Sequence, residues 1–147
     1  MKVEETRKVD APIEKVFGFV SNVQEMAKAF PDSVIKIEVL SENDTGLGAR
    51  FREHRLLGKK KDVIELETVE YVLNEKVASE TVTAGSLWRT GFAVEPEGSG
   101  TLLTISMEAE PQNLFGRILL LLMKSKLKKG GAEEIEKVKA HLERGEA

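Results

Sequence analysis

The sequence predicts an α+β fold: a seven-stranded antiparallel sheet, one long C-terminal helix, and two short helices between the first and second strands. Two periodicities indicate it. Between residues 33 and 109 apolar and polar residues alternate, and turn residues recur at regular intervals, as in consecutive hairpins. From residue 112 to 144 apolar or small residues recur at every third or fourth position, which is typical of one helical stripe. Because an antiparallel sheet usually buries one face, and only this helix is long enough to cover it, we expect the helix to lie across the sheet.

The composition narrows the class of protein. At 147 residues the chain has the size of one domain, which we place over residues 1–147, and it can bury a substantial core. It has no cysteine, so disulfides, thiolate nucleophiles and cysteine-bound metals are excluded. A formal net charge of -3 provides no general attraction for nucleic acid. The N-terminus has no apolar signal region, and the apolar run 118–123 is far shorter than the roughly 20 residues that span a bilayer, so we expect a cytoplasmic protein.

The N-terminal part of the chain predicts a strand followed by two short helices. The strand covers residues 1–9, where apolar and polar side chains alternate weakly, as in an edge strand. Asp10-Ala11-Pro12 then indicates a helix start, because the carboxylate can cap free N–H groups and the proline sits where a missing donor costs nothing. A second short helix, capped by Ser21 or Asn22, is ended by Pro31.

Six further strands are predicted between residue 33 and the long helix. Each is bounded by a turn that contains glycine, asparagine or charged residues. They cover residues 34–40, 49–57, 62–71, 77–83, 87–94 and 101–109.

The long helix is predicted over residues 112–144, after Pro111. Its stripe consists of Leu114, Ile118, Leu121, Leu122, Ser125, Ala132, Ile135, Val138 and Leu142. Its first half has more apolar residues than a stripe requires, because Phe115, Leu119, Leu120 and Met123 lie outside the stripe. We expect this first half to line a ligand site. Gly130-Gly131 costs about 1 kcal/mol per glycine inside a helix and predicts a hinge, a kink or a tolerated defect.

Several short motifs recur in an order that resembles a known family. They are Asp10-Ala11-Pro12, Phe30-Pro31, Gly46-Leu47-Gly48-Ala49-Arg50-Phe51-Arg52-Glu53, Phe92-Ala93-Val94-Glu95-Pro96 and Gly100-Thr101-Leu102-Leu103-Thr104. This order resembles the START-like or Bet v 1-like (SRPBCC) superfamily, and within it the polyketide cyclase/dehydrase and lipid-transport group. The chain departs from the family pattern where Phe30 replaces a tryptophan and where Leu73-Asn74 replaces a pair of prolines.

The resemblance implies the helix-grip fold, in which the sheet curves around the C-terminal helix and encloses a cavity for a hydrophobic or amphipathic molecule. Such proteins include lipid and sterol carriers and enzymes that cyclise polyketides. They share no universal catalytic residue, so the resemblance implies no catalytic group and no cofactor here.

Candidate pocket residues lie on the strands, the helix and the segment before the second strand. Trp88, Thr90 and Phe92 share one face of their strand, and Met107 lies on the matching face of the last strand. A tryptophan and a methionine are typical of adaptable apolar cavities, although each of these residues also fits an ordinary core. The full set of predicted pocket residues is Phe30, Phe51, Glu53, Arg55, Trp88, Thr90, Phe92, Met107, Ile118 and Leu122.

The third strand leaves two registers open. If Phe51 faces inward, Glu53 and Arg55 enter the cavity and could orient the polar end of a ligand. In the opposite register Arg52 and His54 point inward, and His54 could act as a general base. The alternative for all of these side chains is an exposed strand surface, where an ion pair contributes under about 1 kcal/mol.

No pattern in the sequence predicts a metal or phosphate site. His54 and His141 are far apart in the sequence, without carboxylates at ligand spacing. Gly46-Leu47-Gly48 is a turn that no helix follows, so it is not a phosphate loop.

Three functions fit these observations. We expect first a non-catalytic protein that binds or transports a lipid, sterol or polyketide-like molecule between sheet and helix. The first alternative is an aromatase/cyclase- or dehydratase-type enzyme acting on a polyketide-like carbonyl compound through His54 or Glu53. The second is a docking module in which the surface 115–123, followed by the lysines of 124–129, meets a membrane or a protein.

Overall fold

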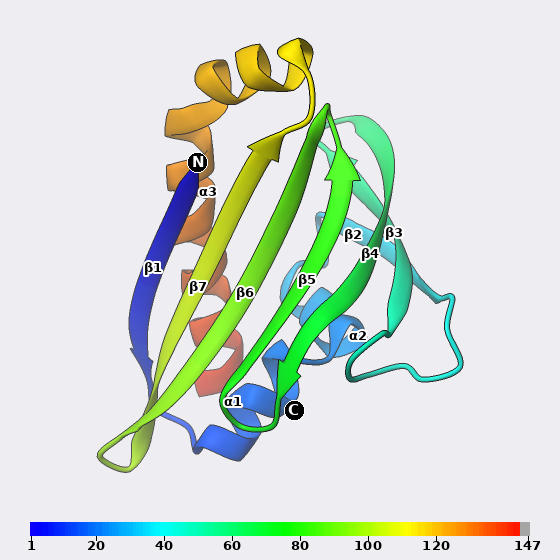
Figure 1. The fold of residues 1–147 in the computed structure, drawn as a ribbon. Helices are drawn as coiled ribbons and strands as arrows, with labels where there is room; N and C mark the ends of the chain where they lie inside the picture. Colours follow the sequence, from blue (N-terminus) through cyan, green and yellow to red (C-terminus); the bar gives the residue numbers. More distant parts are fainter. Residues whose placement is uncertain (145–147) are drawn as a thin grey trace.

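A computed structural model describes residues 1–144 and confirms the predicted fold class (Figure 1). Among the described residues it contains seven strands and one long helix, with a short helical region between the first two strands. The elements are β1 (Lys2–Val9), α1 (Ile13–Val20), α2 (Val23–Met26), the 3-10 turn η1 (Ala27–Ala29), β2 (Val34–Val39), β3 (Arg50–Leu57), β4 (Lys60–Val72), β5 (Lys76–Thr83), β6 (Ser86–Glu97), β7 (Gly100–Pro111) and α3 (Leu114–Glu143).

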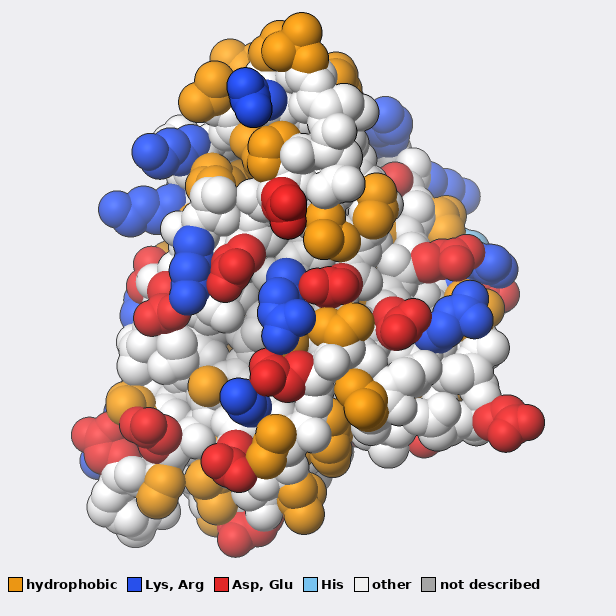
Figure 2. Space-filling model, viewed as in Figure 1, with side chains coloured by type: hydrophobic (Ala, Val, Ile, Leu, Met, Phe, Trp, Pro, Cys, Tyr) orange, Lys and Arg blue, Asp and Glu red, His pale blue; other side chains and the backbone are white. Residues whose placement is uncertain are grey.

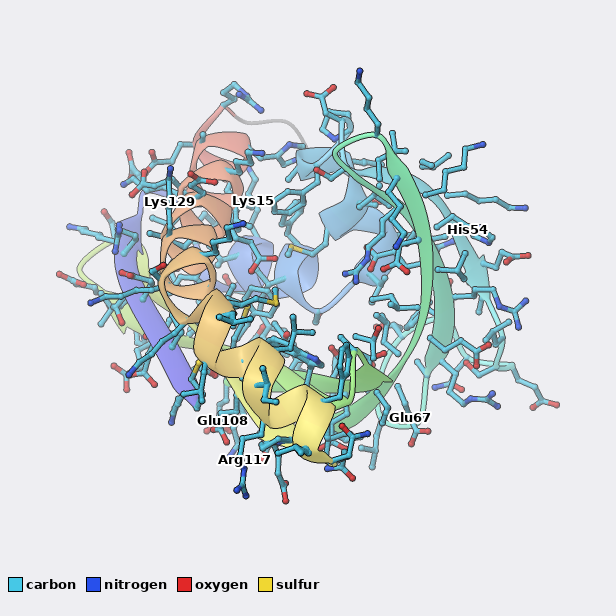
Figure 3. The ribbon with its side chains drawn as sticks, turned by 90° about the horizontal axis from the view of Figure 1, so that it is seen from above. Lys15, His54, Glu67, Glu108, Arg117 and Lys129 are labelled. Carbon is cyan, nitrogen blue, oxygen red and sulfur yellow. The ribbon has the colours of Figure 1, made fainter. Side chains whose placement is uncertain are left out.

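The strands form one antiparallel sheet in the order β1-β7-β6-β5-β4-β3-β2. Strands β2 to β7 follow one another as hairpins. The first strand, β1, pairs with the last, β7, at the edge of the sheet opposite β2. The sheet is strongly curved, so that β3 and β4 stand across from α3 when the molecule is seen from above (Figure 3). This curvature leaves a space that the helices close from one side.

The short helices begin differently from the prediction in one respect. Asp10 does not cap α1, whose N-cap is Pro12 without a side-chain hydrogen bond. Instead the backbone N–H of Asp10 donates to Glu143 at 2.9 Å, which joins the start of α1 to the end of α3. Asn22 caps α2 as one of the two predicted candidates, since its side chain accepts from the N–H of Glu25 at 3.1 Å.

The core lies between the second half of α3, helix α1 and the strands β1, β6 and β7. Its largest fully buried side chains include Phe17 of α1, Leu103 and Ile105 of β7, and Ile135 and Leu142 of α3. Burying each such side chain stabilises the fold by about 1.5 to 3 kcal/mol. The second half of α3 is therefore anchored firmly to the sheet.

The first half of α3 does not pack as predicted. Figure 1 shows α3 crossing over one end of the sheet, then bending and descending beside β1 and β7. Of the predicted stripe, Ile135, Val138 and Leu142 are buried, whereas Leu114, Ile118, Leu121 and Leu122 are 50–74% exposed. The cause is the bend in α3. In a straight helix the stripe would face the same surface along its whole length, but here the first half of α3 lies beyond the strands that its second half covers.

The glycine pair does not interrupt the helix, because α3 runs without a break from Leu114 to Glu143. Gly131 is buried where α3 approaches the sheet, and a Cβ atom there would lie 3.2 Å from the Met107 side chain and 3.3 Å from Val3. A Cβ atom on Gly130 would meet nothing within 4 Å. Gly131 thus permits a close approach, whereas Gly130 has no such role.

The start of α3 is fixed on the tip of the β5–β6 hairpin. The Asn113 side chain caps the helix by accepting from the N–H of Gly116 at 2.8 Å, and the Gln112 N–H donates to Gly85. A Cβ atom on Gly116 would overlap the carbonyl group of Gly85, so only glycine allows this contact. The hairpin therefore determines where the helix begins and which end of the sheet it crosses.

Candidate functional site

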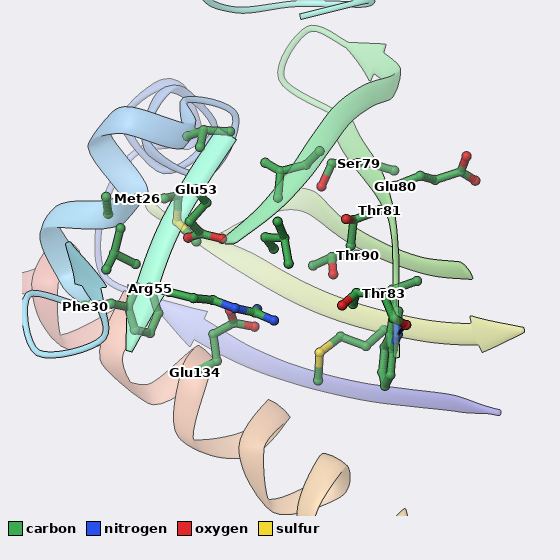
Figure 4. A pocket seen from close by; sticks show the side chains of 18 of the residues that line it. Met26, Phe30, Glu53, Arg55, Ser79, Glu80, Thr81, Thr83, Thr90 and Glu134 are labelled. Carbon is green, nitrogen blue, oxygen red and sulfur yellow. Dashed lines mark hydrogen bonds between the residues drawn. The ribbon is translucent and has the colours of Figure 1, made fainter. Parts of the chain in front are cut away.

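A cavity of about 690 Å³ lies inside the curved sheet (Figure 4). Its walls come from the α1–α2 region, the inner faces of β3 to β7, and α3. Most of the lining surface is apolar, with polar groups on β3, β4, β5, β6 and α3. Ligand pockets typically measure 300–1,000 Å³ and are lined mainly by apolar side chains, and this cavity has both properties.

Seven of the ten predicted pocket residues line this cavity. They are Phe30, Glu53, Arg55, Trp88, Thr90, Phe92 and Met107. Phe51 instead belongs to the core, since it is 1% exposed and is not part of the lining. Ile118 and Leu122 lie on the exposed surface of the first half of α3 and also stay outside it. Because α3 bends, its contribution comes from Met123, Leu127 and Glu134 instead.

The register of β3 has Glu53 and Arg55 on the cavity side. Arg52 and His54 alternate with them and lie on the outer face, where Figure 3 shows His54 pointing away from the space enclosed by the sheet. There His54 Nε2 lies 2.6 Å from Glu38 Oε2, and Arg52 lies 3.7 Å from the same oxygen. The hydrogen bond from His54 lowers the pKa of Glu38. His54 is therefore not placed to act as a base in the cavity.

A cluster of charged side chains lies between β3 and β4 on one side of the cavity and α3 on the other. Arg55 Nε and Nη2 donate to Asp62 Oδ2 of β4 at 3.0 and 2.8 Å. Glu53 projects from the same strand as Arg55, and Glu134 projects toward them from α3 (Figure 4). The cluster thus joins three elements that are distant in the sequence.

The two glutamates are held in an environment that disfavours their charged forms. Burial, and then the charge of Glu53, raises the pKa of Glu134 to about 7. Burial also raises the pKa of Glu53, against the opposing effect of Arg55. The Glu134 Oε2 atom is buried without a hydrogen-bond partner among the described residues, although the residue as a whole is partly exposed. Such a pair can hold a proton near neutral pH or accept hydrogen bonds from a ligand.

At the opposite end the cavity is bordered by Trp88 and by threonines of β5 and β6. The Trp88 indole donates from Nε1 to the Thr83 carbonyl at 3.2 Å, which fixes the ring while its face remains half-buried. Thr81, Thr83 and Thr90 add hydroxyl groups to the lining. The only tryptophan of the chain is therefore a cavity residue and a spectroscopic reporter.

Glu134 is the principal site residue that the sequence analysis missed. A signal for it exists, because Glu134 lies three residues after Gly131 and four before Val138, both of which are buried on the packing side of α3. A carboxylate at that spacing faces inward, where an unpaired charge is costly and therefore informative.

The described part of the chain has neither a cluster of metal ligands nor a helix that could span a bilayer. Residues 1–144 contain no group of three or more histidine, aspartate or glutamate side chains that could hold a metal ion. Within the same residues, none of the helices has the length and apolar character needed to cross a membrane.

Solved structures from several organisms have the same fold. Protein TTHA0849 from Thermus thermophilus has a TM-score of 0.77 at 17% identity, with 100% of both chains covered. Truncated norcoclaurine synthase from Thalictrum flavum has a TM-score of 0.76 at 12% identity, covering 97% of this chain and 92% of that one. Protein CV1439 from Chromobacterium violaceum has a TM-score of 0.72 at 20% identity, covering 97% and 98%. At these identities the likeness shows a common fold.

Comparison of the sequence with family models identifies the family, which the structural likeness alone does not. No curated protein matches the chain at a significant level. The family model described as "Polyketide cyclase / dehydrase and lipid transport", however, matches residues 1–143, which is nearly the whole chain. The chain therefore belongs to the polyketide cyclase/dehydrase and lipid-transport family, the group that the motif order predicted.

Proposed function

We propose that this protein binds an apolar or amphipathic small molecule in the cavity between the sheet and α3. The observation that carries the proposal is the cavity itself: about 690 Å³ of space beside a core that is otherwise closely packed. The cavity opens partly to solvent, so its apolar walls are in contact with water. A ligand that covers these walls would remove apolar surface from water, which favours binding.

Trp88 provides the test, because its indole lines the cavity and is the only one in the chain. Sterols, fatty acids and aromatic polyketides are titrated against the protein while tryptophan emission is recorded. We expect at least one class to shift the emission in a saturable manner. Native mass spectrometry of freshly purified protein would in addition detect a molecule that copurifies. A panel that leaves the emission unchanged would count against a ligand beside Trp88.

A matched pair of variants ties the signal to the cavity. Thr90→Phe places a ring in the cavity and should weaken binding, with circular dichroism confirming the fold. His54→Ala, on the outer face of β3, should leave ligand affinity unchanged. If both variants bind equally well, the ligand lies elsewhere.

A second candidate function is docking to an anionic membrane through the first half of α3. Hydrophobic side chains gather over this segment in Figure 2, with lysine and arginine side chains at its flanks. The exposed apolar residues are Leu114, Phe115, Ile118, Leu121 and Leu122. An exposed cluster of large apolar side chains is unusual on the surface of a soluble protein and is typical of interaction sites.

The charges of the same segment specify the partner. Between residues 114 and 132 the chain has five basic residues and no acidic one, although acidic residues outnumber basic ones over the whole sequence by 25 to 22. The β3–β4 hairpin brings Lys59, Lys60 and Lys61 to the same end of the sheet, because antiparallel pairing places its tip beside the tip of β5–β6. Apolar side chains flanked by basic ones fit the interface of an anionic bilayer.

Vesicle sedimentation tests this second candidate. We expect binding to vesicles that contain phosphatidylserine, weaker binding at high salt, and loss of binding in the double variant Leu121→Glu with Leu122→Glu. The control is Leu73→Glu, because Leu73 is 66% exposed but lies in the β4–β5 turn at the other end of the sheet. Absence of binding at both salt concentrations would refute membrane docking. It would also be refuted if the wild-type protein self-associates and the double variant does not, because the apolar surface would then be an interface between copies of the protein.

A further inference from the structure

We propose that the polar end of the cavity recognises a protonated amine on an otherwise apolar ligand, held between the carboxylates of Glu53 and Glu134. The inference rests on the proposed binding function and specifies the chemical class of the ligand. It follows from the charges that line the cavity and from which of them already have partners.

The charged lining is predominantly acidic. Strand β3 contributes Glu53 and Arg55, β4 contributes Lys60 and Asp62, β5 contributes Glu80, and α3 contributes Glu134. The lining residues from the α1–α2 region, β6 and β7 carry no charge. Four carboxylates thus face two basic groups, so a cation entering the cavity meets a favourable field.

Most of these charges are already paired. Arg55 donates twice to Asp62, and Glu80 lies 3.5 Å from Arg89 of β6. Lys60 is exposed at the end of the cavity where β4 begins. Glu53 and Glu134 remain, and neither accepts a hydrogen bond that the described residues provide. They are the two lining carboxylates without a partner among the described residues, so a cationic ligand can neutralise their charge.

A proton on Glu134 reduces the negative charge of this pair. Burial, and then the charge of Glu53, raises the pKa of Glu134 to about 7. An ammonium group can replace the proton, because it has a positive charge and three N–H donors, enough to reach both carboxylates. A hydroxyl group offers one donor and no charge, whereas a carboxylate would meet two acceptors of its own sign.

Arg55 does not reverse this preference. Its guanidinium is held by Asp62 through two nitrogens, so it neutralises that carboxylate first. A carboxylate ligand would have to displace Asp62 and bring a further negative charge beside Glu53 and Glu134. The geometry therefore favours an amine over a fatty acid.

Isothermal titration calorimetry with three ligands of equal chain length tests the proposal. The ligands are octylamine, octanol and octanoate, used at pH 6 and pH 8 with the whole protein. At pH 8 we expect octylamine to bind about ten-fold or more tightly than octanol, and octanoate to bind most weakly. At pH 6 the amine should lose several-fold in affinity, because the proton on the glutamate pair competes with it.

The variant Glu134→Gln replaces the carboxylate by a neutral amide of nearly the same shape. It therefore separates recognition of the amine by the carboxylate from binding of the apolar chain alone. It should abolish the preference for octylamine while leaving octanol affinity unchanged, and Glu133→Gln, on the exposed side of α3, should behave like wild type. Tighter binding of octanoate than octylamine, or an unchanged preference in Glu134→Gln, would overturn the proposal while leaving cavity binding intact. Failure of all three ligands to bind would instead refute the binding function on which it rests.

Discussion

Replacing Glu134 by glutamine should remove a pH-dependent part of the stability of this protein. Burial and the charge of Glu53 raise the pKa of Glu134 from 4.5 to about 7, so the folded state holds a proton that the unfolded chain releases. The sign follows from linkage: for this group stability is fully present below about pH 4.5 and is lost as the pH rises through about 7. Glutamine is neutral throughout and cannot show this loss.

The expected magnitude comes from the size of the shift. Each pKa unit corresponds to about 1.4 kcal/mol, so the wild-type protein should lose about 2 to 3 kcal/mol between pH 5 and pH 8 through this group. The other carboxylates occur in both proteins, so their effects largely cancel in the difference between variant and wild type. Glu134→Gln should therefore gain about 2 to 3 kcal/mol relative to wild type over this pH interval.

Urea denaturation at four values between pH 5 and pH 8, followed by circular dichroism, measures this difference directly. Glu133→Gln serves as the control, because Glu133 is an exposed carboxylate on the same turn of α3. Its free energy of unfolding should run parallel to that of wild type. If Glu134→Gln also runs parallel to wild type, within about 0.5 kcal/mol, the carboxylate does not retain a proton in the folded state and the reasoning fails.

Three further tests concern the packing of α3 and the face of β3. Gly130→Ala should raise the free energy of unfolding by up to about 1 kcal/mol through helix propensity. Gly131→Ala should gain less or destabilise, because its Cβ atom meets neighbouring side chains, and thermal unfolding compares the two variants. Gly116→Ala should lower the free energy of unfolding by about 2 kcal/mol or more, because the new methyl group overlaps Gly85, and an unchanged melting temperature would contradict this contact. His54→Asn should leave the inner cavity and its ligand affinity intact, which Trp88 emission can check.

The fold could be predicted because its signals are local. The alternation of Leu103, Ile105 and Met107, and the turns between strands, each specify one hairpin without information from elsewhere in the chain. The register of β3 could not be predicted, since both of its faces carry charged residues and alternation alone does not distinguish them. In the structure Phe51 decides it: burying this ring places Glu53 and Arg55 on the cavity side and His54 outside.

The site was predicted least well where it depends on the path of α3. The sequence shows a single apolar stripe along the helix. Such a stripe predicts that one face of the helix is buried, but it does not indicate how far along the helix the burial extends. The Gly116–Gly85 contact fixes the helix start at the hairpin tip, while Ile135 and Leu142 fix its second half on the core. A helix held at both places must bend between them. The bend places Glu134 in the cavity and leaves Leu121 and Leu122 exposed, so one constraint accounts for both the missed site residue and the unpaired apolar surface.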